Sequence, residues 1–149
     1  MTEPRQPLLV PIRAPGDDPL YRVVQPWRYD WELRGWPPQR LTVPRGFEMD
    51  GASVPRLLWT FTGITPDGLH RAAAVAHDFI YRYSGHLPMG AHIFHCQGKG
   101  WRDTGHLWTR EEADRLFARI LRECGVSKFR RRIMYLGVRL GGWRSWKSL

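Results

Sequence analysis

The chain has 149 residues, of which 42% are hydrophobic and 13% aromatic, which suits a globular protein with a real core and excludes a disordered one. The formal net charge is +9, two cysteines provide no disulfide framework, and no apolar run approaches the ~20 residues of a transmembrane helix. The cysteine usage leads us to expect folding in a reducing cytoplasm, and the first residues lack the basic and apolar regions of a signal peptide. We expect one domain, 1–149, with a proline-rich arm (1–20) and a basic C-terminal helix or tail (128–149).

The N-terminal third is predicted to be a small antiparallel β-meander. Prolines recur along the arm 1–20, which blocks helix and favours extended or edge segments. Residues 27–33 alternate apolar and polar side chains with a period of two, as a half-buried strand does. Shorter strands are expected at 21–25, 40–43 and 47–49, with turns at 35–39 and 44–46.

Three helices are predicted to follow. Residues 69–83 carry apolar side chains at three- and four-residue spacings, and Gly85 ends this helix. Thr109 and Glu112 form a capping box at the start of a second helix, which stops at Gly125. Ser127 is expected to cap a third helix, and its inner face is predicted to consist of Phe129, Ile133, Leu136 and Leu140. The predicted fold class is α+β, with the meander packed against about three helices.

Residues 84–108 are rich in Gly, His and Trp and have no clear assignment, although a hairpin with Ile93 and Phe94 on one strand fits the pattern. This segment holds potential metal ligands close together, but a second ligand pair at zinc-finger spacing is lacking. A metal site and exposed loop histidines therefore remain alternatives. The residues concerned are His86, His92, His95, Cys96 and His106.

Segment 128–149 holds seven lysines and arginines and no acidic residue. Such a segment attracts anionic surfaces through its long-range field. Three interpretations remain: a solvated helix face beside an acidic neighbour, a contact for an anionic membrane surface or acidic partner, and, ranked last, a contact for nucleic acid.

The most informative motif is His77-Asp78 on the apolar helix 69–83. Adjacent helical residues point about 100° apart, so Asp78 cannot orient the His77 ring by a direct bond. Asp114, in the apolar frame of the next helix, is the candidate for that role, because a carboxylate that accepts from one ring nitrogen leaves the other free as a base. Tyr81, one turn from His77, adds a hydroxyl. The alternative is a buried polar network that only pins two helices together.

Residues 50–55, Asp-Gly-Ala-Ser-Val-Pro, form the second candidate site. In the functional interpretation, Asp50 completes a hard-cation site with Asp78, and a divalent cation such as Ca²⁺ is the expected cofactor. In the structural interpretation, Asp50-Gly51 is a turn and Ser53 is a helix N-cap.

Residues 43–56, 73–81 and 112–117 together resemble the phage-associated family catalogued as domain of unknown function 1353, and the match spans about 27–140. The resemblance implies a bacteriophage or prophage origin, a compact single domain and no settled activity. It also implies other phage proteins as partners and a location in the host cytoplasm or the virion. The stretch 85–108 is longer than the link expected there, which suggests an additional contact surface.

The series His77-Asp78, Tyr81 and Asp114 is also similar to the arrangement in secreted phospholipase A2. That likeness implies His77 as the general base for a water, Asp78 as a calcium ligand and Asp114 as the residue that orients His77. The chain departs from that family in lacking flanking disulfide cysteines and a glycine-rich calcium loop.

Two functions are therefore expected. The first is a virion- or tail-associated accessory protein with a His/Asp hydrolase-like site that acts on the host envelope. The second is a non-catalytic virion structural or adaptor protein in which the His/Asp cluster is a structural lock, meaning a set of buried polar contacts that holds helices together.

Overall fold

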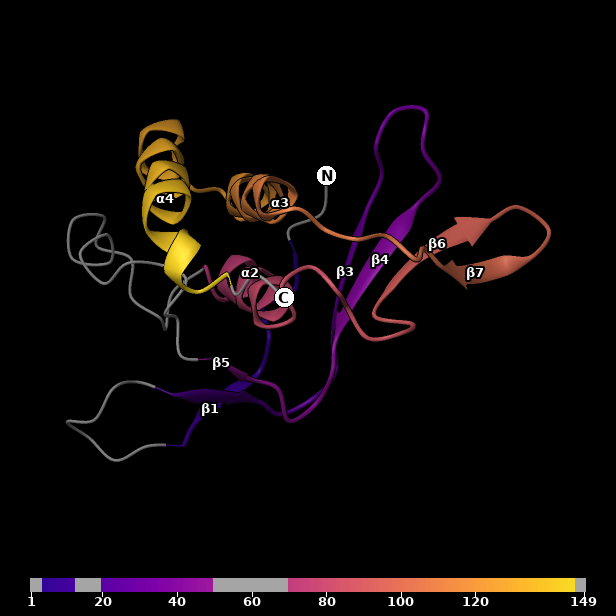
Figure 1. The fold of residues 1–149 in the computed structure, drawn as a ribbon, viewed down its shortest axis with the longest axis horizontal. Helices are drawn as coiled ribbons and strands as arrows, with labels where there is room; N and C mark the ends of the chain where they lie inside the picture. Colours follow the sequence, from indigo (N-terminus) through magenta and orange to yellow (C-terminus); the bar gives the residue numbers. More distant parts are fainter. Residues whose placement is uncertain (1–3, 13–19, 50–69, 147–149) are drawn as a thin grey trace.

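The computed structural model describes residues 4–12, 20–49 and 70–146. Within these residues the chain forms strands mainly in the N-terminal part and helices mainly in the C-terminal part (Figure 1). The α+β fold class predicted from the sequence is confirmed. The strands form two antiparallel sheets, where the sequence suggested one small sheet.

The first sheet has the order β1-β2-β5 and consists of β1 (Leu9–Pro11), β2 (Tyr21–Val23) and β5 (Glu48–Met49). The proline-rich arm supplies β1 as an edge strand. Proline is tolerated there because an edge strand needs no hydrogen-bond donor on its outer side.

The second sheet has the order β3-β4-β6-β7 and consists of β3 (Trp27–Trp31), β4 (Gln39–Val43), β6 (His92–Cys96) and β7 (Gly100–Asp103). The hairpin β6–β7 confirms the arrangement suggested for 84–108, and Ile93 and Phe94 lie on β6. Along β3, the side chains of Trp27, Tyr29 and Trp31 are buried and the residues between them are exposed, as the period of two predicts.

Two prolines lie where the chain passes from one sheet to the other. Pro26 separates β2 from β3, and Pro44 begins the turn between β4 and β5, in which Gly46 has φ +86°. Proline cannot donate to a strand ladder, and glycine adopts positive φ without strain. The chain therefore leaves the second sheet after Val43, and β5 pairs with β2.

The helices are α2 (Arg71–Arg82), α3 (Arg110–Glu123) and α4 (Lys128–Gly141), followed by the short 3-10 helix η1 (Gly142–Arg144). Helix α2 contacts strands of both sheets and packs against α3, and α3 packs against α4 (Figure 1). The predicted capping box of α3 is present in both directions between Thr109 and Glu112. Ser127 occupies the N-cap of α4, but its side chain makes no capping hydrogen bond. Among the described helices, none combines the length and apolar character required to cross a bilayer.

The predicted inner face of α4 is wrong for three of its four residues, and the fourth, Ile133, is half-buried. Met134 and Val138 are its buried residues, whereas Phe129, Leu136 and Leu140 are 73%, 56% and 76% exposed. The observed orientation of α4 about its own axis brings Arg139 to Asp114 of α3. Arg139 Nη1 and Asp114 Oδ2 form an ion pair 2.8 Å apart. Because a buried carboxylate strongly favours a cationic partner, this contact helps to select the face on which α4 packs.

Candidate functional site

The predicted contact between His77 and Asp114 is present. His77 Nε2 lies 2.6 Å from Asp114 Oδ1, and the Tyr81 hydroxyl donates to the same oxygen over 2.6 Å. Arg139 Nη1 donates to the other oxygen, Oδ2, over 2.8 Å. The carboxylate of Asp114 therefore joins α2, α3 and α4, and Arg139 is the member that the sequence did not reveal.

The surroundings of this cluster favour a charged carboxylate. Burial raises the pKa of Asp114, but the hydrogen bonds from His77, Tyr81 and Arg139 outweigh burial and hold this pKa below its usual value. Burial and the hydrogen bond to Asp114 raise the pKa of Tyr81, so its hydroxyl keeps its proton. The result is a fixed, charge-assisted set of contacts.

The centre of this cluster is closed to solvent, whereas the Arg139 side chain at its edge is 29% exposed. The exposed fractions of His77 and Asp114 are both 0%, and that of Tyr81 is 2%. A general base must reach the proton that it abstracts. This geometry matches a structural lock better than a catalytic dyad.

The tentative cation site cannot be assembled from the described residues. Asp78 is buried on α2, but Asp50, its expected companion, lies outside the described residues, as do Gly51 and Ser53. Within the described ranges, there is no group of three or more His, Cys, Asp or Glu side chains that could hold a metal ion.

The histidines of the 84–108 segment do not gather into one ligand set. His86 Nδ1 contacts the carbonyl of Ser84, and His95 packs edge-on against Trp101. Among the histidines of this described segment, only the rings of His92 and His106 contact one another, with centroids 5.9 Å apart. These two line a cleft that the sequence did not predict.

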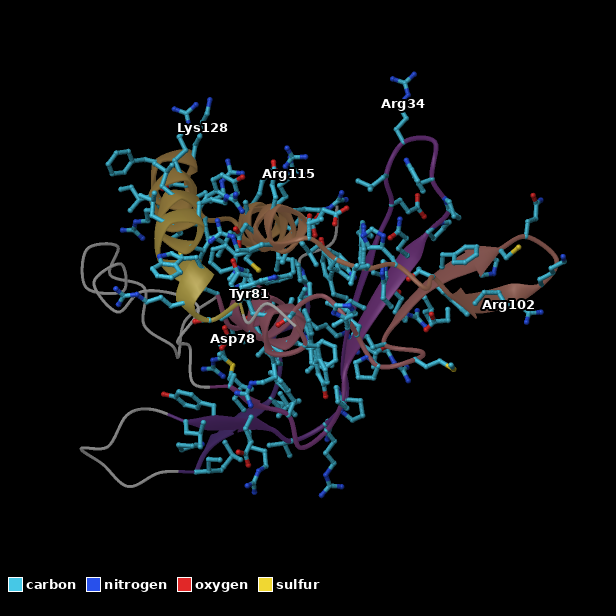
Figure 2. The ribbon with its side chains drawn as sticks, viewed as in Figure 1. Arg34, Asp78, Tyr81, Arg102, Arg115 and Lys128 are labelled. Carbon is cyan, nitrogen blue, oxygen red and sulfur yellow. The ribbon has the colours of Figure 1, made fainter. Side chains whose placement is uncertain are left out.

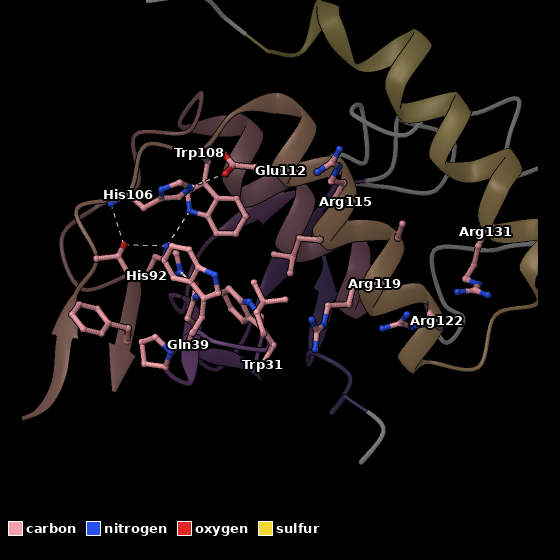
Figure 3. A pocket seen from close by; sticks show the side chains of 17 residues that line it. Trp31, Gln39, His92, His106, Trp108, Glu112, Arg115, Arg119, Arg122 and Arg131 are labelled. Carbon is pink, nitrogen blue, oxygen red and sulfur yellow. Dashed lines mark hydrogen bonds and ion pairs between the residues drawn. The ribbon is translucent and has the colours of Figure 1, made fainter. Parts of the chain in front are cut away.

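The cleft has a volume of about 880 Å³ and lies between the second sheet and α3 (Figure 3). It is larger than most voids in a packed interior and lies in the usual range for small-molecule sites. One end is aromatic and is lined by side chains from β3, β6 and the segment that leads into α3. The other end is lined by arginines of α3 and α4. The main aromatic and cationic residues are Trp31, Trp36, His92, Trp108, Arg122 and Arg131.

His92 organises the aromatic end. Its ring stacks on Trp31 with centroids 5.4 Å apart, and Trp108 Nε1 donates to His92 Nδ1 over 3.2 Å. An indole nitrogen can only donate, so Nδ1 carries no proton and Nε2 donates to Gln39 Oε1, 2.8 Å away. Burial, followed by the nearby charge of His106, lowers the pKa of His92 to about 4. The ring is therefore neutral at pH 7.

The arginine end combines two arginines held in ion pairs with one that has an unpaired buried atom. Arg115 pairs with Glu111, and Arg119 pairs with Glu123. Arg131 has a buried Nε atom with no hydrogen-bond partner among the described residues. A buried donor without an acceptor is uncommon in proteins. Four arginines line the cleft, and Glu112 is its acidic residue among those described.

Part of this site had a sequence signal. The alternation of Trp27, Tyr29 and Trp31 predicts a row of aromatic rings on one face of β3, and the observed centroid distances along it are 6.2 and 5.5 Å. The arginines of α3 also share a helical face by their spacing at 115, 119 and 122. Neither pattern shows that Trp31, at the end of the aromatic row, lines the same cleft as the arginine row.

A family model described as "Protein of unknown function (DUF1353)" matches residues 21–138. Since this match covers most of the 149 residues, the chain belongs to that family. No curated protein matches the chain, and no solved structure matches it.

Proposed function

We propose that this member of the DUF1353 family is a phage- or prophage-encoded accessory protein that acts by binding and not by His/Asp catalysis. Its ligand is an anionic glycan of the host envelope, held in the cleft between the second sheet and α3. The proposal rests on one contrast. The cleft is open and lined by aromatic and arginine side chains, whereas the His77–Asp114 pair is fully buried.

The chemistry of the cleft fits a sugar that bears a phosphate or carboxylate group. Trp36 lines the cleft and is 67% exposed, so its ring is available to pack against the apolar face of a sugar. Arginine binds phosphate and carboxylate groups in a bidentate manner, and Arg122 and Arg131 both line the opposite end.

The contacts of Asp114 support the structural role of the His/Asp cluster. The carboxylate accepts hydrogen bonds from residues of both neighbouring helices, and Arg139 neutralises its charge. Removing one member of such a buried network leaves the others unpaired, so the network contributes strongly to stability while it is complete.

Binding is tested by recording the indole N–H signals of the eight tryptophans by NMR. The probes are a glucuronic acid-containing disaccharide, a sugar phosphate, a neutral disaccharide and AMP. We expect the two anionic sugars to shift the signals of Trp31, Trp36 and Trp108, while Trp143, outside the cleft, stays unchanged. Shifts with AMP but with neither anionic sugar would assign the cleft to nucleotides and contradict the proposal.

Matched variants locate the binding. Arg122→Ala is expected to weaken the binding of the anionic sugars by about tenfold or more, because a charge-assisted hydrogen bond is lost. Arg102→Ala removes an exposed arginine of β7, outside the cleft, and should leave affinity unchanged. Equal losses in both variants would mean that net charge and not the cleft governs binding.

The absence of His77 catalysis is tested separately with phospholipid and cell-wall substrates. We expect no turnover by the parent protein above that of a His77→Asn variant that is still folded. Turnover by the parent that this variant loses would restore the hydrolase interpretation.

Association with the virion is part of the same proposal. This part rests on the phage association that the family resemblance implies. Mass spectrometry of purified particles is expected to detect the chain, and its absence from them would contradict this part of the proposal.

A further inference from the structure

Helix α4 presents a second apolar stripe, which faces away from the protein. Phe129, Leu136 and Leu140 are 73%, 56% and 76% exposed, and Trp143 of η1 is 60% exposed. A helix turns by about 100° per residue, so positions 129, 136 and 140 lie within about 40° of one another. Exposed apolar residues are common one at a time, but an aligned set marks a contact surface.

This outer stripe lies opposite the face that packs on the protein. The buried residues of α4 are Met134 and Val138, and α4 packs against α3. The helix therefore has one apolar face that serves the fold and another that the fold leaves exposed.

Cations flank the outer stripe on both sides. Lys128 and Arg132 lie on one side of it and Arg130 on the other, and all three are exposed. Arg144 lies beyond the end of the helix and is also exposed. Figure 2 shows Lys128 projecting from the end of α4 into solvent. Between residues 128 and 146 the sequence has no acidic residue that would neutralise these charges.

We propose that α4 docks on the surface of an anionic lipid bilayer, with Phe129, Leu136, Leu140 and Trp143 in the interface and the flanking cations at the headgroups. A helix with Trp, Phe and Leu on one face and Lys and Arg beside it lies in the plane of such an interface. Long basic side chains reach the headgroups while their apolar stems stay with the acyl region. The surface is separate from the cleft, so the inference goes beyond the proposed glycan binding.

Other binding partners would match only part of this surface. A second copy of α4 would cover the apolar stripe but would bring two clusters of positive charge together. A nucleic acid would pair the cations and leave the apolar side chains in water. An anionic bilayer matches both the charge and the apolar stripe.

The test is co-sedimentation of the full chain with vesicles of phosphatidylcholine alone or of phosphatidylcholine and phosphatidylglycerol in about equal amounts. We expect binding to the anionic vesicles at least about tenfold tighter than to the neutral ones. We also expect this binding to weaken steeply between ~0.1 M and ~0.5 M NaCl, because salt screens exposed charges. No binding to the anionic vesicles, or equal binding to both kinds, would overturn the proposal.

Exposed positions allow variants that leave the fold intact. The double variant Leu136→Ser/Leu140→Ser is expected to bind anionic vesicles at least about tenfold more weakly, because two apolar side chains no longer enter the interface. The matched control is Met89→Ser/Leu107→Ser, which removes two residues exposed by 94% and 55% outside α4. A loss of similar size in both variants would contradict a docking surface on α4.

A second pair of variants separates position from net charge. Lys128→Ser/Arg132→Ser is expected to lower affinity by about fivefold for each charge removed. Arg34→Ser/Arg102→Ser removes the same charge from the strand region, well away from α4 (Figure 2), and should have a much smaller effect. Equal effects would show that the overall charge of +9, and not α4, drives the binding.

Discussion

The indole nitrogen of Trp108 donates a hydrogen bond to Nδ1 of His92 over 3.2 Å, which fixes the neutral form of this imidazole in the wall of the cleft. Protonation of Nδ1 would place an N–H group against another N–H group. The aromatic end of the cleft is therefore built around a histidine that must remain uncharged.

This arrangement predicts a loss of stability on acidification. The pKa of His92 is lowered to about 4 by burial and by the charge of His106, whereas the unfolded chain has the usual value near 6.5. Between these values the unfolded state binds more protons, so the stability contributed by neutral His92 falls as the pH drops from about 6.5 to about 4. The loss amounts to about 3 kcal/mol at most. Urea unfolding at several pH values measures it.

The control for this prediction is a comparison of His92→Gln with His95→Gln. The first variant removes the buried titrating group and should flatten the pH dependence, while the second removes an exposed ring. An unchanged pH dependence in His92→Gln would mean that this residue is not held neutral.

Truncation of the Asp114 side chain is predicted to cause a large loss of stability. Asp114→Ala leaves His77 and Tyr81 with buried polar groups that have lost their acceptor, so we expect unfolding to become easier by ~3–5 kcal/mol. Asp30→Ala breaks an exposed pair with Arg40 and should cost about 1 kcal/mol or less. Chemical unfolding of both variants provides the measurement, and similar small losses would argue against a structural lock.

Gly85 is predicted to be intolerant of a side chain. Its φ is +83°, and a Cβ atom would collide with the carbonyl oxygen of Trp108. Gly90 has a similar φ of +81° but open space around it. Gly90→Ala should therefore cost only the strain of positive φ, ~1–2 kcal/mol, while Gly85→Ala costs more and displaces Trp108 at the cleft. Thermal unfolding ranks the two variants, and the Trp108 indole signal should move only in Gly85→Ala.

The packing of α4 is tested by substituting two apolar residues that lie close together in the sequence. Met134 is 2% exposed, so Met134→Ala should destabilise the protein by about 2–5 kcal/mol. Leu136 is 56% exposed, and Leu136→Ala should change stability by about 0.5 kcal/mol or less. The reverse order in urea unfolding would mean that α4 packs on the face first predicted from the sequence.

Local signals in the sequence predicted much of the fold. The capping box at Thr109 and Glu112 depends on residues three positions apart, and the strand 27–33 follows from simple alternation, so both could be recognised without tertiary information. The contact of His77 with Asp114 was also accessible, because two polar groups in neighbouring apolar helices need a partner.

The remaining features depend on long-range contacts. Helix α4 has apolar residues on two faces, and its sequence alone does not say which one packs, since the choice involves the ion pair of Arg139 with Asp114. The closure of the His77 cluster is set by three helices together, and the cleft is formed by strands and helices far apart in the chain. Periodicity within one element cannot report such relationships.

The role of the His77–Asp114 cluster as a structural lock depends on its closure to solvent. It is tested most directly by mass spectrometry of deuterium exchange at the C2 position of each histidine ring in the native protein. We predict that His77 exchanges at least about tenfold more slowly than His95 and His106, which are exposed. Exchange of His77 at the rate of those exposed rings would contradict the account, because a solvent-reachable imidazole beside Asp114 would again be a candidate base.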